Sequence, residues 1–102
     1  METKNTHDVA STEKMIQLIK GEFTPSQAAE LISSLLDHKI NHHKIEGLKL
    51  WESNHNSNQE PISNRIKELE NERKTAQEFI SGISGNGKNL KINGFIKISV
   101  IG

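Results

Sequence analysis

The sequence predicts a mainly α-helical fold: an antiparallel hairpin of two long helices, with a short N-terminal helix and a C-terminal β-strand. Three observations predict this class. Apolar residues recur in a heptad pattern over residues 62–83, a helix-capping motif occupies residues 24–27, and apolar and polar residues alternate over residues 90–100. We expect residues 1–10 to be a disordered N-terminus and residues 11–102 to form a single domain.

The composition favours a small protein that associates with other chains. The 13 basic and 13 acidic residues balance, which removes the broad positive field that binding to nucleic acid or anionic membranes usually needs. Hydrophobic residues make up 32% of the chain, and adding the seven glycines still leaves it below the usual range of about 45–50%. A monomer would have a thin core, and small domains with thin cores often oligomerise.

The sequence also indicates a cellular compartment. It contains no cysteine, which excludes disulfides and thiolate metal sites and fits a reducing environment. No apolar run approaches the roughly 20 residues that span a bilayer, and the N-terminal residues lack the layout of a signal peptide. We expect a soluble cytoplasmic protein with no membrane partner.

The first element is predicted to be a short helix over residues 12–20. Ser11 can cap it, Met15, Ile16 and Ile19 would share one side, and Gly21 would end it.

The first long helix is predicted over residues 25–52. Thr24 and Gln27 have the spacing of a capping box, in which each side chain accepts a hydrogen bond from the backbone of the other. Pro25 falls at the first helical position, where its missing amide costs nothing. Gly47 interrupts the helix, at a cost of about 1 kcal/mol relative to alanine.

The second long helix is predicted over residues 61–84, after a polar connector at residues 54–59. Its apolar positions alternate at spacings of four and three, which is the seam of a helix packed along a partner helix. This seam consists of Ile62, Ile66, Leu69, Arg73, Ala76, Ile80 and Ile83. A polar residue in a seam either fixes the register or extends its charged group to solvent, and we keep both interpretations for Arg73. Its expected partners lie on its own helix: Glu70, Glu72 and Glu78.

The C-terminal segment has the alternation of a β-strand. We favour a single strand over a hairpin turning at residues 93–94, because that hairpin would mix lysine and apolar side chains on both faces. No other strand is evident in the sequence, so this strand either pairs with another copy of the protein or lies as a tail on the hairpin. Its apolar face is the predicted interaction surface: Leu90, Ile92, Ile96, Ile98 and Val100.

Two patterns suggest other chemistry. His38 and His42 lie one helical turn apart and Glu46 follows on the same face, a spacing that can chelate zinc, nickel or copper but falls short of a closed four-ligand site. Ordinary solvated side chains are the simpler interpretation, and the nearby His43 is expected at the edge of the apolar stripe, where it could titrate near neutral pH. We therefore expect no bound metal or cofactor.

The second pattern is a basic C-terminal segment. Lys88, Lys91 and Lys97 flank Phe95, and basic residues beside an aromatic ring can contact single-stranded nucleic acid. Lysine on an exposed strand is also a common device against aggregation, and we do not expect nucleic acid as the partner.

Several stretches resemble a group of small bacterial helical-hairpin proteins with no assigned function. The similar stretches are residues 21–32, 39–43, 63–69 and 90–94. The resemblance implies a compact helical unit and says nothing about mechanism.

The leading functional hypothesis is a non-enzymatic protein-interaction or scaffold module that forms homo-oligomers and can also bind another protein. The sequence contains no glycine-rich phosphate loop and no recognisable catalytic motif. The alternatives are a metal-binding protein that uses the histidine pair and a nucleic-acid accessory protein that uses the basic C-terminal segment.

Overall fold

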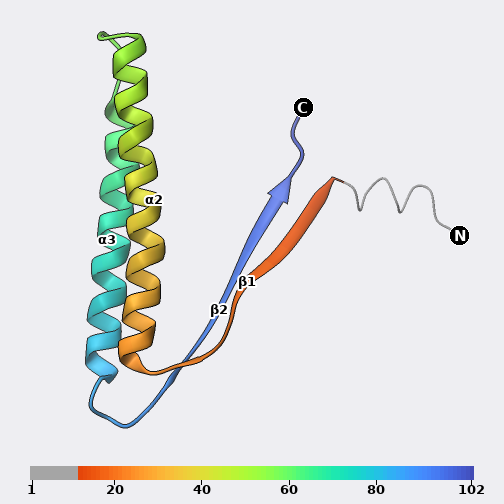
Figure 1. The fold of residues 1–102 in the computed structure, drawn as a ribbon, viewed down its shortest axis with the longest axis vertical. Helices are drawn as coiled ribbons and strands as arrows, with labels where there is room; N and C mark the ends of the chain where they lie inside the picture. Colours follow the sequence, from red (N-terminus) through yellow and green to blue (C-terminus); the bar gives the residue numbers. More distant parts are fainter. Residues whose placement is uncertain (1–11) are drawn as a thin grey trace, which may run out of the picture. The chain divides into compact units, whose positions relative to one another are not determined.

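The computed structural model describes residues 12–102 (Figure 1). The predicted disordered segment at residues 1–10 lies outside the described residues. The described chain divides into two compact units, a helical hairpin within residues 23–90 and a two-stranded sheet formed by the segments on either side of it. Its elements follow in the order β1 (Glu13–Phe23), α2 (Pro25–Ser53), α3 (Glu60–Ile83) and β2 (Leu90–Ser99).

The predicted fold class is wrong at its N-terminus. The segment expected to be a short helix over residues 12–20 is instead strand β1, which pairs with β2 in an antiparallel sheet (Figure 1). The fold is therefore two helices plus a two-stranded sheet, not a mainly α-helical hairpin with one lone strand. The physical reason is pairing: β2 needs a neighbour for its backbone donors and acceptors, and a strand at residues 13–23 supplies one within the chain.

Helix α2 begins at the predicted capping box. The Thr24 amide donates to Oε1 of Gln27 at 3.1 Å, and the Gln27 amide donates to Oγ1 of Thr24 at 3.2 Å. Pro25 occupies the first turn, as expected. The amide of Asn54 donates to the Leu50 carbonyl at the other end of the helix, and the Asn54 side chain then accepts from the Asn56 amide to start the connector.

Helix α3 lies antiparallel beside α2 and buries the predicted seam (Figure 1). Every seam residue is buried or half-buried, and Leu69 and Ile80 are the most enclosed. From α2, Ala28 and Ile40 are also buried; these four are the buried hydrophobic residues in the described part of the chain. The core is therefore as thin as the composition predicts.

Gly47 explains how the two helices approach each other near the connector. It is buried, and a Cβ atom at this position would come within 2.9 Å of Oε1 of Gln59 and 3.4 Å of Cγ2 of Ile62. The glycine weakens α2 locally but leaves room for the first turn of α3.

Between two cross-strand contacts, strand β1 has one residue more than strand β2. The Val100 amide donates to the Thr12 carbonyl at 2.9 Å, and a Cβ atom on Gly94 would lie 3.5 Å from Cβ of Ile19. Seven positions separate Thr12 from Ile19, whereas six separate Gly94 from Val100. Strand β1 therefore contains one extra residue between Thr12 and Ile19, which is a β-bulge, while β2 alternates regularly.

Within residues 12–102, neither helix combines the length and the apolar character needed to cross a membrane.

Candidate interaction surfaces

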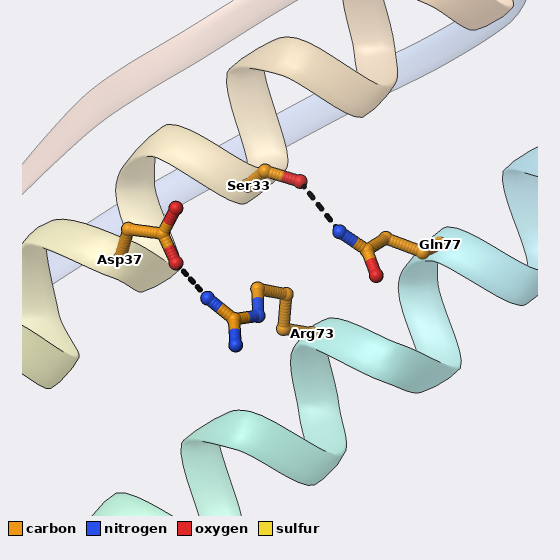
Figure 2. Close-up of polar contacts among 4 residues, drawn as sticks. All are labelled: Ser33, Asp37, Arg73 and Gln77. Carbon is orange, nitrogen blue, oxygen red and sulfur yellow. Dashed lines mark hydrogen bonds and ion pairs between the residues drawn. The ribbon is translucent and has the colours of Figure 1, made fainter.

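Two polar contacts join the helices beside the apolar seam (Figure 2). The guanidinium of Arg73 on α3 forms an ion pair with the carboxylate of Asp37 on α2. One turn along each helix, Nε2 of Gln77 donates to Oγ of Ser33 at 3.1 Å. A slip of one helical turn would break both contacts, so both are specific to the observed register of the hairpin.

The expected partners of Arg73 are therefore wrong. The sequence pointed to glutamates on its own helix, but the guanidinium crosses to the neighbouring helix. The Arg73 side chain is 33% exposed and that of Asp37 is 55% exposed, so water screens the ion pair and its energetic contribution is small.

An open groove of about 500 Å³ lies between the helices near the connector. Gly47, Leu48 and Trp51 line it from α2, and Ile62 and Ile66 line it from α3. Leu48 is 56% exposed and Trp51 is 47% exposed, and the Trp51 ring stacks at a tilt on His55 with 4.2 Å between ring centroids. This groove is an exposed apolar surface on the hairpin.

His38, His42 and Glu46, the candidate metal ligands of α2, do not form a cluster. His38 and His42 are exposed, and Glu46 is engaged by His43, whose Nδ1 lies 3.0 Å from the carboxylate Oε1. Among residues 12–102, no group of three or more histidine, aspartate or glutamate side chains has the geometry to hold a metal ion. His43 itself is half-buried at the edge of the groove, as expected.

The hydrogen bond from His43 lowers the pKa of the Glu46 carboxyl, and the positive charges of His43, His42 and Lys39 add to the effect. A carboxyl whose pKa is lower in the folded state stabilises the fold above the ordinary glutamate pKa of about 4.3. That stabilisation disappears as the pH falls through the lowered value.

We expect the His43→Gln substitution to raise the pH midpoint of the Glu46 carboxyl. The measurement is a side-chain carboxyl titration by NMR, made on the unsubstituted chain and on the variant. An unchanged midpoint would show that His43 does not hold the carboxyl in solution.

One basic residue of the C-terminal segment, Lys97, contacts an acidic residue of the other strand. Lys97 forms an ion pair with Glu13 of β1, with 3.5 Å between Nζ and Oε2. Lys91 and Phe95 are exposed on the same face of β2 as Lys97, and Lys88 precedes the strand. The acidic side chain from β1 thus breaks the purely basic surface that the C-terminal segment alone suggested.

The predicted interaction residues lie on one face of the sheet, because β2 alternates without a break. Leu90 and Ile92 are half-buried, whereas Ile96, Ile98 and Val100 are 43%, 50% and 69% exposed. The single strand is confirmed, but its pairing partner is β1 of the same chain. Association through this surface remains a prediction.

Strand β1 adds apolar residues that the sequence analysis assigned to a helix or left out. Met15, Ile16 and Leu18 are 58%, 40% and 54% exposed. Between Ile19 and Phe23 the charged residues Lys20 and Glu22 alternate with Ile19, Gly21 and Phe23, and the structure buries these alternate positions partly. This short alternation was a signal for a strand in the sequence.

Comparison with known proteins gave no match: no family model, no curated protein and no solved structure is significantly similar to the chain.

Proposed function

We propose that this protein is a non-enzymatic interaction module that self-associates through its two-stranded sheet. The observation that carries the proposal is the exposed apolar sheet. Met15, Ile16 and Leu18 of β1 and Phe95, Ile96 and Ile98 of β2 are each at least 40% exposed. Phe95 lies on the opposite face of β2 from Ile96 and Ile98, so apolar side chains are exposed on both faces of the sheet. Exposed apolar surface of this kind is a common feature of association sites.

The backbone supports the same proposal. In the described residues the sheet has two strands, so each strand has one edge whose amides and carbonyls have no strand beside them. A two-stranded sheet is only marginally stable in water, and three or more strands are usually needed for independent stability. A further strand would form hydrogen bonds with the backbone amides and carbonyls of one edge and would extend the apolar face.

The thin core of the hairpin adds a second reason for association. Its buried hydrophobic residues in the described part of the chain are Ala28, Ile40, Leu69 and Ile80. Alanine contributes little buried area, and full burial of an isoleucine or leucine side chain provides about 1.5–3 kcal/mol each. Small domains with so little buried surface commonly gain stability from a partner.

A second copy of the chain is the occupant we favour. The formal net charge of the chain is zero, so two copies do not repel each other strongly. One face of β2 is apolar and its free edge carries backbone donors and acceptors, and a second copy of the same strand would complement both properties.

Co-expression of two differently tagged copies tests the proposal. We expect purification through one tag to retain the other copy in a stoichiometric amount, at high salt as well as low salt, because apolar contacts and backbone hydrogen bonds resist salt screening. A matched control co-expresses one tagged copy with an unrelated small protein that carries the second tag. Recovery of only the directly captured copy would contradict self-association.

A further inference from the structure

We propose that two copies pair antiparallel along the free edges of β2, with the two-fold axis at Phe95, to form a four-stranded sheet in the order β1-β2-β2-β1. This inference rests on the proposed self-association and adds the edge, the register and the number of copies. It uses the regularity of one strand, the bulge in the other and the positions of the lysines.

The bulge selects which edge is used. Strand β1 contains an extra residue between Thr12 and Ile19, and a bulge twists an edge and interrupts its regular ladder of hydrogen bonds. In strand β2 half-buried and exposed residues alternate from Leu90 to Phe95, and isoleucine continues to alternate with lysine or serine up to Ser99. The free edge of β2 is therefore the one that offers an unbroken ladder to a new strand.

The direction of the backbone groups follows from one contact. The Val100 amide points to β1, because it donates to the Thr12 carbonyl. Backbone groups alternate in direction along a strand, so those of Ile96 and Ile98 also point to β1. The backbone amides and carbonyls of Asn93, Phe95 and Lys97 point to the free edge, where a second copy can bind them.

The positions of Lys91 and Lys97 limit the registers in which two copies of β2 can pair. A two-fold axis at Gly94 would place Lys91 directly opposite Lys97 of the second copy, and like charges facing each other destabilise a sheet. An axis at Ile96 would place three residues of β2, Leu90, Lys91 and Ile92, opposite positions beyond Ser99, whereas an axis at Phe95 does so for Leu90 alone. The axis at Phe95 also separates the lysines, because Lys91 faces Ser99 and Lys97 faces Asn93.

The same axis aligns the apolar face over the whole strand. Leu90 faces Val100 of the second copy, Ile92 faces Ile98, and Gly94 faces Ile96. On the other face, the two Phe95 rings meet at the axis, where an aromatic pair stabilises cross-strand contacts. Phe95 is 60% exposed in the single chain, which leaves its ring accessible for this contact.

Proline substitution tests the edge. Lys97→Pro removes an amide that points to the free edge of β2, and its matched control Lys20→Pro removes one that points to the free edge of β1. Proline is tolerated at such positions because no hydrogen bond within the sheet is lost. By symmetry the dimer loses two hydrogen bonds in Lys97→Pro, so we expect its dissociation constant to rise roughly tenfold or more, while Lys20→Pro leaves it unchanged.

Cysteine pairs test the register, and the natural absence of cysteine gives a clean background. In the double variant Ile92→Cys with Ile98→Cys, each new thiol faces its counterpart on the second copy, at a Cα separation of about 4.5 Å that suits a disulfide. The two positions in one chain are about 20 Å apart and cannot bridge. We expect mild oxidation to give a covalent dimer.

Two matched double-cysteine variants test the registers on either side of the proposed one. Ile92→Cys with Ile96→Cys would cross-link if the axis were at Gly94, and Ile92→Cys with Val100→Cys would cross-link if it were at Ile96. We expect both to stay unlinked. Cross-linking in either of these instead of the first variant would overturn the register, and equal weakening by the two proline variants would overturn the choice of edge.

The failure of this inference differs from the failure of the proposed function. Suppose the chain dimerises, but none of the three cysteine pairs forms a cross-link and Lys97→Pro leaves the dimer intact. That result contradicts the pairing of β2 and leaves self-association in place. An unsubstituted chain that remains monomeric at all concentrations in sedimentation contradicts both.

Discussion

Replacing Ile80 with alanine is expected to lower the free energy of unfolding by about 2–4 kcal/mol, which is a large part of the stability of a small domain. Ile80 is 7% exposed and is one of four buried hydrophobic residues in the described part of the chain. With so few other buried side chains, little else in the hairpin compensates for the lost apolar burial. Urea denaturation followed by circular dichroism measures the change.

The preceding residue provides the matched control. Phe79 is 64% exposed on the same helix, and Phe79→Ala removes a larger side chain than Ile80→Ala does. Both substitutions introduce alanine into α3, so they share the gain in helix propensity. We expect Phe79→Ala to cost less than about 1 kcal/mol. Equal losses for the two variants would show that the seam does not form the core in solution.

The second large effect is expected on assembly. Ile98→Glu places a carboxylate on the apolar face of β2, and in the inferred register that carboxylate faces Ile92 of the second copy. Ile98 is 50% exposed in the single chain, so the new carboxylate stays in contact with solvent when the chain is alone. The sheet of each chain should therefore persist.

We expect Ile98→Glu to weaken self-association roughly thirtyfold or more, because two apolar cross-strand contacts are lost by symmetry. Sedimentation velocity over a range of concentrations measures the change. The matched control is Ile101→Glu, which makes the same chemical change at a residue that is 92% exposed and lies beyond the strand. If the control weakened association as much, added charge rather than the sheet face would be responsible.

The helical hairpin could be predicted from the sequence because its signals are local. The capping box needs only Thr24 and Gln27, and the structure places both hydrogen bonds there. The seam needs only regular spacing along one helix, and all of its residues are buried or half-buried. Where a signal is confined to one turn or one helical face, the sequence determines the element with little help from the rest of the chain.

Strand β1 could not be predicted in the same way, because its structure depends on a distant partner. Met15, Ile16 and Ile19 have spacings that fit one side of a helix, and two adjacent apolar pairs, Met15–Ile16 and Leu18–Ile19, interrupt the alternation typical of a strand. Pairing with β2, which is more than 65 positions away in the sequence, decides whether this segment forms a helix or a strand. A preference so weakly set by local residues yields to tertiary contacts.

The partner of Arg73 was missed for a related reason. Its own helix offers several glutamates within reach, and the sequence alone does not distinguish these from a carboxylate on the other helix. The antiparallel register brings Asp37 opposite Arg73, and the neighbouring contact of Gln77 with Ser33 is set by that same register (Figure 2). Strand β2 was predicted from its alternation, but its pairing with β1 in the same chain was not foreseen.

The most direct test of self-association is the mass of the unsubstituted chain in solution, measured by sedimentation equilibrium at several concentrations. The account predicts a mass that approaches twice the 11.4 kDa of one chain as the concentration rises. A mass that stays at 11.4 kDa throughout would contradict it, since the sheet would then remain exposed with no second copy to pair with.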